Sequence, residues 1–391
     1  MINHIKHIAL ALTGLAAVIS CERQLPEYSS GEYILFSSPG MTVETRSGEL
    51  LDAITEDFGV LGYCIPYVQG SHDNLDYNAG TSGWEVKKAN CPPTVFYKQR
   101  VSSNGIYDSE GGSANNPKYW YRNGWGLGGK DPNIPADAEN YRYTFFAYFP
   151  YGDNYWTISP SSESSAGGPI LTFTIPQDQG GNVETTRLDA TKNIDAMLAM
   201  EKDVTRGSGD VTFEFSHILT ALGFEINNFS DYSLIVHSLK LRGNFYRQLQ
   251  VDFSKRNVEM EFTTTDERYS GYYDLLPNGP IDLSTDEDTP INSAHPGVEL
   301  GTHILLISGD SNNYDNKYFG EDIEVVIGYT FNGAYVESLA KSRPGTFTPR
   351  PGIRYTAQLN FVGDAFVLNF IVDNDEEWED GIPDDDEVIF E

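Results

Sequence analysis

The stretch DVTFEFSHILTALGFEI, residues 210–226, decides how this chain folds. Its first half alternates apolar and polar residues, which is the pattern of a strand with one buried face. The residues on that face are Val211, Phe213, Phe215 and His217. Leu219 and Leu222 break the period, which indicates a helical or tight turn before a second short strand over residues 224–226. We therefore expect one β-rich unit upstream of this stretch and another downstream.

Composition favours antiparallel β structure. The chain has 391 residues, of which 39% are apolar, with 24 Tyr and 21 Phe. This length suits roughly two or three domains. Short aromatic runs separated by Gly, Pro, Asn and Asp are typical of antiparallel strands. The sequence predicts an all-β protein of two tandem antiparallel β-sandwich domains, residues 30–205 and 206–375, followed by an acidic tail, residues 376–391.

Individual strands can be placed by the same pattern. In the first domain we expect strands over residues 33–36, 41–46, 58–67, 94–101, 141–149 and 171–175. Both faces of the stretch 141–149 are apolar, which is typical of a central strand. The second domain shows about seven strands by alternation, among them residues 249–253, 258–262, 323–331, 353–361 and 366–372. Residues 335–342 are predicted as a single helical stretch.

The net charge argues against a nucleic-acid partner. The chain carries 57 Asp and Glu against 26 Lys and Arg, a formal charge of −31. Binding a phosphate backbone needs clustered Lys and Arg, which such a field opposes. The acidic run from residue 373 onward matches a calcium-loop motif poorly, so no metal site is predicted there.

The N-terminus has the features of a bacterial lipoprotein signal. Lys6 precedes an apolar run, residues 8–19, that is too short to span a membrane and fits a signal peptide over residues 1–20. Its end, VISC, resembles a lipobox whose acceptor is Cys21. A diacylated Cys21, followed by a tether over residues 21–29, would anchor the protein, and Glu22 favours the outer membrane. A plain secretory signal with a chance cysteine is the alternative.

Candidate sites elsewhere point to structure rather than catalysis. Cys64 and Cys91 either form a disulfide or are two small buried side chains. His217 and His237 are expected to be buried and neutral, because no nucleophile accompanies them. Neither a cofactor site nor catalytic residues are predicted. Loop aromatics form either a sugar platform or part of the core, and these are Tyr119, Trp120, Tyr121 and Trp125.

Taken together, several segments resemble the fimbrillin family of pilus subunits. They are PKYWY (117–121), YTFFAYFPYGD (143–153), DAMLAMEKDVT (195–205), VTFEFSHILTALGFEI (211–226) and RPGIRYTAQLNF (350–361), behind the lipobox. The resemblance spans most of the mature chain in the family's order. It implies two sandwiches of transthyretin-like topology, lipoprotein export, and assembly into a cell-surface fimbria used for adhesion to a host or bacterial glycan or protein receptor.

The resemblance also implies a mechanism of assembly. An arginine-specific protease cuts after the first strand, and the C-terminal strand of a neighbouring subunit then fills the groove. Arg46 lies where that cut is expected. The C-terminal run of three apolar residues, 388–390, is short for a donor strand, so a tip or accessory subunit stays open. A monomeric carbohydrate-binding surface lipoprotein is the alternative function, and an extracellular hydrolase is disfavoured because the carboxylates are scattered.

Overall fold

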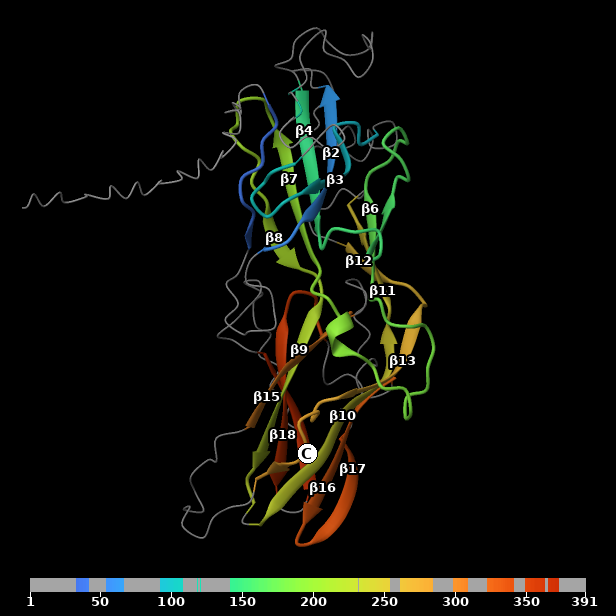
Figure 1. Cartoon of the computed structure of the whole chain (residues 1–391), viewed down its shortest axis with the longest axis vertical. Coiled ribbons are helices and arrows are strands. Elements are labelled where there is room, and N and C mark those ends of the chain that lie inside the picture. The colour runs from blue at the N-terminus through green and yellow to red at the C-terminus, as the bar shows by residue number, and fades with distance from the viewer. Residues whose placement is uncertain are drawn as a thin grey trace, which may run out of the picture.

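Figure 1 shows the computed structural model as an elongated all-β molecule with two halves stacked along its longest axis. The structure describes residues 33–41, 54–66, 92–107, 118, 120, 141–230, 232–253, 261–283, 298–308, 322–340, 349–362 and 365–372. The prediction of an all-β, largely antiparallel protein is confirmed. One short 3₁₀ turn, η4 (Ala190–Lys192), lies near the junction of the two halves.

The upper half in Figure 1 is a sandwich of two sheets. Its larger sheet has the order β1 (Gly40–Met41), β8 (Glu214–His217), β7 (Met197–Val204), β4 (Tyr141–Phe149), β2 (Phe58–Pro66) and β3 (Phe96–Val101). Its smaller sheet has the order β12 (Glu261–Thr264), β11 (Gln248–Asp252), β6 (Ile170–Thr174) and β5 (Trp156–Ser159). The two sheets are joined by aromatic contacts, such as Phe146 with Phe253 at 5.0 Å and Tyr148 with Trp156 at 5.6 Å.

The larger sheet is buried on both faces. Leu61, Phe146 and Leu198 face the smaller sheet. On the opposite face, Phe145 and Met197 belong to a second apolar cluster. That cluster is completed by segments outside the strands, through Ile34, Phe36, Ile54, Tyr107 and Trp120. The prediction that β4 is a central strand apolar on both sides is therefore confirmed.

The lower half is a second sandwich. One sheet has the order β13 (Arg268–Asp274), β10 (Leu234–Tyr246), β16 (Ile323–Phe331) and β17 (Ala334–Ala340), with β14 (Ile281–Asp282) also paired to β10. The other has the order β15 (Val298–Leu306), β9 (Thr220–Asn228), β18 (Arg354–Val362) and β19 (Ala365–Val372). Tyr329 links the two sheets through ring contacts with Phe361 and Phe366.

The deciding stretch 210–226 carries the chain from one half to the other. Its alternating residues lie on the buried face that the sequence predicts, in and just before β8. A tight turn at Ile218 and Leu219 follows, and β9 starts at Thr220, four residues before the predicted second strand. Strand β9 is buried almost throughout because it lies between β15 and β18. Because both faces of β9 are apolar, its sequence lacks the alternation of apolar and polar residues by which a strand is predicted.

Two predictions in the lower half are wrong. Residues 335–342 do not form a helix, because β17 covers most of that range and pairs with β16 through a two-residue hairpin turn. The turn residues Asn332 and Gly333 have φ of 47° and 77°, the left-handed values that favour such a hairpin. The count of about seven strands is also too low, because β13, β14 and β15 were not recognised.

His237 is exposed rather than buried. A β-bulge between Val236 and Ser238 in the pairing with β16 inverts the alternation of β10 at this point. The His237 ring therefore lies on the outer face, where its Nε2 is 2.6 Å from Thr330 Oγ1.

The sheets cross the predicted boundary between residues 205 and 206. Just after this boundary, Gly207 and Gly209 lie in the turn between β7 and β8, which are both strands of the upper half. Strands β11 and β12 also belong to the upper half, where β11 pairs with β6. The downstream part of the chain therefore contributes residues 248–252 and 261–264 to the upper sandwich.

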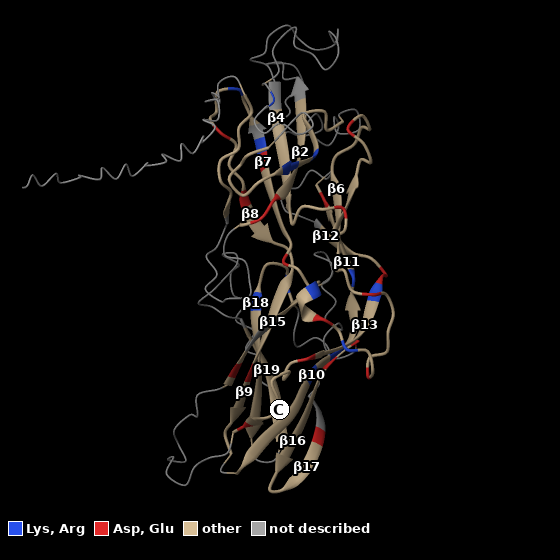
Figure 2. Cartoon of the chain, viewed as in Figure 1, with Lys and Arg blue, Asp and Glu red and all other residues tan. Residues whose placement is uncertain are grey.

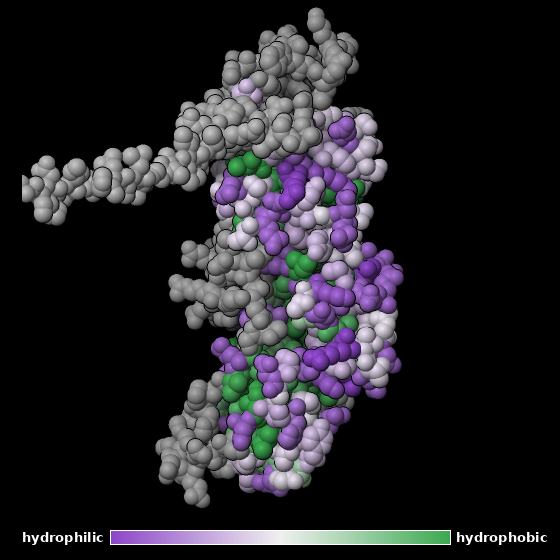
Figure 3. Space-filling model, in the orientation of Figure 1, coloured by the Kyte–Doolittle hydropathy of each residue, from purple (hydrophilic) through white to green (hydrophobic). Residues whose placement is uncertain are grey.

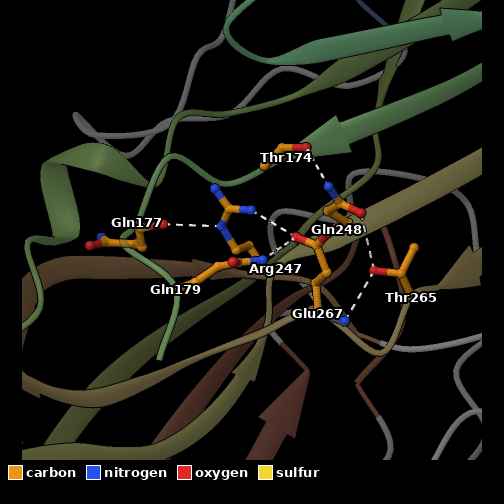
Figure 4. Close-up of polar contacts among 7 residues, drawn as sticks. All are labelled: Thr174, Gln177, Gln179, Arg247, Gln248, Thr265 and Glu267. Atoms are coloured by element: carbon orange, nitrogen blue, oxygen red, sulfur yellow. Dashed lines mark hydrogen bonds and ion pairs between the residues drawn. The ribbon is translucent and has the colours of Figure 1, made fainter. Parts of the chain in front are cut away.

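The two halves are connected by short links. Only Arg247 separates β10, in the lower half, from β11, in the upper half. Figure 4 shows that Arg247 is held by neighbours from both directions. Its Nε donates to Gln177 O at 3.1 Å and its Nη1 to Glu267 Oε2 at 2.8 Å. Glu267 also accepts a hydrogen bond from Gln179 Nε2 at 2.7 Å. It lies in the second connection between the halves, which joins β12 to β13.

Candidate functional site

Residues 33–41 form the outer edge of the larger upper sheet. They run parallel to residues 211–215, with Phe36 opposite Val211 and Gly40 opposite Glu214. Ser37 N donates to Val211 O at 3.0 Å, and Val211 N donates to Leu35 O at 2.8 Å. The segment is therefore an added edge strand, attached through main-chain hydrogen bonds.

The opposite side of the segment is held by a loop tyrosine. The Tyr107 hydroxyl donates to Ile34 O at 2.6 Å and accepts from Lys118 N at 2.9 Å. Ile34 N donates to Lys118 O at 2.8 Å. Burial raises the pKa of Tyr107 well above its usual range, because the phenolate would lose its hydration. A neutral Tyr107 is thus part of the attachment.

Two side chains of the segment enter the core. Ile34 is fully buried and Phe36 is 6% exposed. The Phe36 ring lies 5.3–5.9 Å from the rings of Phe96, Tyr107, Phe145 and Phe213. Burial of each such side chain contributes roughly 1.5–3 kcal/mol. The seat thus takes two apolar residues at i and i+2, and it is shaped for a strand.

This arrangement has a simple chemical consequence. If residues 33–41 left, Val211 and Phe213 would lose main-chain partners, and the aromatic seat would be open to water. An exposed sheet edge beside an apolar channel is a site for adding another strand. We define the strand seat as the groove that Ile34 and Phe36 fill.

Several predicted site residues lie outside the described residues. Cys21, Arg46 and Cys91 are among them, and Arg46 comes five residues after Met41, the last residue of β1. Cys64 lies on β2, half buried, and packs against the second apolar cluster. The disulfide between Cys64 and Cys91 stays a prediction.

The described histidines are placed differently from one another. His217 is buried with Asp195, its Nδ1 lying 2.9 Å from a carboxylate oxygen, as expected for a structural histidine. His303 lies on β15 beside Gly223. His295 lies outside the described residues. No group of three or more His, Cys, Asp or Glu that could hold a metal ion occurs within the described part of the chain.

Trp120 belongs to the core and not to a sugar platform. It is fully buried and contacts the rings of Tyr143 and Phe145. The other three loop aromatics, Tyr119, Tyr121 and Trp125, lie outside the described residues. The structure therefore removes Trp120 from the carbohydrate-binding alternative.

No pattern in the sequence indicates the strand seat or the cavity lined by Asp57, Arg100 and Tyr151. Ile34 and Phe36 were visible as a short alternating run, but nothing local shows what such a run packs against. The cavity joins three distant segments, so no spacing in the sequence could indicate it.

Comparison with known proteins decides the family. A sequence profile described as fimbrillin-like matches residues 95–370. The chain belongs to the fimbrillin-like family. The matched region includes every strand of the upper sandwich except β1 and β2, and nearly all of the lower sandwich. A search of curated proteins found no match.

A search of solved structures found matches in three bacterial genera, Bacteroides, Parabacteroides and Porphyromonas. A candidate cell adhesion protein from Bacteroides uniformis has 13% identity and a TM-score of 0.42, with 90% of this fimbrillin-like chain and 100% of the other covered. A fimbrial assembly protein from Parabacteroides distasonis has 10% identity and a TM-score of 0.37, with 86% and 94% covered. A tip fimbrial protein from Porphyromonas gingivalis has 8% identity and a TM-score of 0.30, with 87% and 98% covered.

Family membership identifies this fimbrillin-like chain as a fimbrial subunit or adhesin of the cell surface. Membership of this family indicates a structural role and association with other fimbrial subunits. In the view of Figure 2, the described Lys and Arg residues are scattered and form no basic stripe. No helix in the described residues is long and apolar enough for a membrane span.

Proposed function

We propose that this protein is a fimbrial subunit of transthyretin-like sandwiches that is exported as a lipoprotein and polymerises by strand exchange after its N-terminal strand, together with the lipid anchor, has been removed. The observation that carries the proposal is the strand seat: residues 33–41 form an edge strand whose Ile34 and Phe36 fill an aromatic groove. Such a segment can be replaced without rebuilding the sandwich, because every other strand of the sheet keeps its neighbour.

The place of the expected cut supports this proposal. Cleavage after Arg46 would sever the segment from the rest of the chain beyond β1. Only main-chain hydrogen bonds, two apolar side chains and a few polar contacts would then hold it. Once severed, the segment dissociates as a separate peptide, and its release becomes concentration-dependent.

The C-terminal sequence fits the dimensions of the strand seat. Val388 and Phe390 have the same i, i+2 spacing as Ile34 and Phe36. Each pair combines a β-branched residue with a phenylalanine. A donor with two anchors is therefore long enough for this seat, although a longer alternating strand would bind more tightly. Donation from each subunit to the next is head-to-tail and does not close, so it generates filaments.

The experiment compares three forms of the full chain on cells that produce an arginine-specific protease. They are the wild type, Arg46→Ala and, as a matched control, Arg206→Ala, which alters an exposed arginine in the turn after β7. We expect surface filaments by negative staining, and detergent-resistant ladders on gels, for the wild type and Arg206→Ala. Ladders of normal length from Arg46→Ala would contradict cleavage-dependent exchange.

Two further variants test the donor and the anchor. Phe390→Asp places a charge where an apolar anchor is expected, so we expect loss of the ladders with normal cleavage at Arg46. Cys21→Ala is expected to abolish incorporation of labelled palmitate and to release the uncleaved precursor from outer-membrane fractions. Normal assembly by Phe390→Asp would exclude this donor segment, and unchanged palmitate labelling of Cys21→Ala would exclude the anchor.

A further inference from the structure

A small cavity lies on the upper sandwich, away from the strand seat. Its volume is about 370 Å³, and the described residues that line it are Glu56, Asp57, Arg100 and Tyr151. They come from the start of β2, the end of β3 and the loop after β4, which meet at one end of the sheet. Ligand pockets span about 300–1,000 Å³, so this one suits a small ligand.

An ion pair between Arg100 and Asp57 forms the charged side of the cavity, and both groups have further hydrogen-bonding positions. Arg100 donates from Nε and Nη2 to the Asp57 carboxylate. The Arg100 side chain is 68% exposed and that of Asp57 is 27% exposed. A guanidinium has five N–H donors and a carboxylate about four acceptor sites, so both groups can serve a ligand as well as each other.

The aromatic side of the cavity is held in place by the backbone. Tyr151 is 37% exposed, although large apolar rings are usually covered. Its backbone N–H donates to Asp57 O at 3.1 Å, which holds the backbone of Tyr151 next to the residue that carries the carboxylate. The cavity therefore has an exposed ring next to a pair of polar groups.

A strained residue borders the same site. Lys98 has φ of 50°, in the left-handed region that non-glycine residues rarely adopt. It lies in a β-bulge, because Val60 and Gly62 pair with Gln99 and Phe96 and leave two residues of β3 opposite one of β2. The bulge directs Lys98 Nζ to Asp153 Oδ1, 2.7 Å away, which ties β3 to the loop that carries Tyr151. Bulges and strained residues often occur beside functional sites, where they direct side chains.

The chemistry of the lining selects one class of ligand. The carboxylate can accept hydrogen bonds from neighbouring hydroxyls and the guanidinium can donate to them. An exposed ring can pack on the apolar face of a pyranose. The lining carries two acidic groups and one basic group, so an anionic ligand is repelled, as it is by the charge of −31 on the whole chain. An apolar ligand would leave the ion pair desolvated without compensation.

We propose that this cavity is a binding site for neutral glycans, with Tyr151 as the stacking surface and Asp57 and Arg100 as the groups that bind sugar hydroxyls. The cavity and the strand seat have different lining residues, because Asp57, Arg100 and Tyr151 are not among the side chains that contact Ile34 and Phe36.

The experiment uses a glycan array with the full chain and matched pairs of variants. The probes are galactose-, fucose- and N-acetylglucosamine-terminated neutral glycans, with sialylated and sulfated glycans for comparison. Tyr151→Ala is matched by Tyr335→Ala, an exposed tyrosine of the lower sandwich. Arg100→Met is matched by Arg187→Met, because Arg187 is 59% exposed and its partner Asp274 is 28% exposed.

We expect the wild type and both control variants to bind neutral glycans equally. Tyr151→Ala and Arg100→Met should bind roughly tenfold more weakly or not at all, with unchanged thermal unfolding. Three outcomes would overturn the proposal: no neutral glycan bound by the wild type, full binding by Tyr151→Ala, or a preference for acidic glycans. Surface ladders of Tyr151→Ala should stay normal, so failure of this site is distinguishable from failure of strand exchange.

Discussion

Phe36 shows how a single residue attaches the N-terminal segment. It reaches four aromatic rings from β3, β4, the loop at Tyr107 and the strand after Gly209. Its backbone, meanwhile, pairs with Val211. The segment around it has few other side chains in the core, so its stability depends on this contact and on Ile34.

We predict that Phe36→Ala lowers the free energy of unfolding by about 3–5 kcal/mol, because it leaves a cavity among four rings. Urea unfolding followed by tyrosine and tryptophan fluorescence measures this. The control Phe229→Ala removes a ring that is 55% exposed and should cost under about 0.5 kcal/mol. A similar cost for both variants would contradict the seat as we describe it.

Tyr107 makes this attachment sensitive to alkali. Burial raises its folded pKa above the ordinary value of 10.0. Its contribution is therefore fully present below the unfolded pKa and is lost as the pH rises from there toward the folded pKa. We predict little change in stability between about pH 7 and pH 9, and a decline above about pH 10.

The measurement is urea unfolding across this range for the wild type and Tyr107→Phe. The variant loses the hydroxyl contacts with Ile34 and Lys118, so it should be less stable at neutral pH and should decline less steeply in alkali. An equal slope for the two proteins would show that Tyr107 does not contribute, because Tyr148 and Tyr269 also have raised pKa values and would account for the decline.

At the scale of elements, the sequence predicts strands best where every second residue is apolar over a long run. Strands β16 and β18 have such runs, and their predicted bounds agree with the structure to within one residue. The predicted strand at β9 is too short because β9 is apolar on both faces. A helix is predicted at β17 because Ala, Val and Leu in AYVESLA also fit one face of a helix. The dipeptide Asn332–Gly333, which favours a two-residue hairpin turn, is the feature of the sequence that indicates the β16–β17 hairpin. The cavity at Tyr151 depends on strand order, which no local pattern contains.

We predict that Gly333→Val destabilises the β16–β17 hairpin by about 1–2 kcal/mol, because a β-branched residue resists a φ of 77°. Ala334→Val is the matched control, since it adds the same side chain at the next position, which is exposed and extended. Thermal unfolding of the two variants provides the comparison. A larger loss for Ala334→Val would show that bulk rather than backbone conformation limits this edge.

At the scale of the whole molecule, the two sandwiches are joined without a long linker. Strand β10 passes into β11 through Arg247, and β12 passes into β13 through residues 265–267. Main-chain hydrogen bonds join the two connecting segments to each other and to the end of β6. Arg247 N donates to Glu267 O, and Ile175 N donates to Arg247 O. Figure 3 shows hydrophobic residues at the surface of the lower half. The exposed large apolar side chains of the lower sandwich include Phe229, Tyr232, Tyr335 and Val362.

We predict that Glu267→Ala loosens the junction, because Arg247 and Gln179 both donate to its carboxylate. The loss should be about 1–2 kcal/mol, since the pair is partly exposed. Hydrogen exchange at the amides of Ile175 and Arg247 should accelerate more than exchange within β16. The control Arg187→Ala removes an exposed pair with Asp274 and should leave both amides unchanged. Equal protection in the two variants would contradict a role for Glu267 in the connection.

The single-residue passage at Arg247 has a mechanical consequence for a filament. A pull along the long axis cannot first straighten a slack tether at this point, because consecutive strands of the two halves follow one another directly. The force instead reaches hydrogen-bonded strands on both sides at once and tends to slide them past their neighbours. Fibres of such subunits would therefore be stiff under tension, and yielding would begin where neighbouring subunits meet.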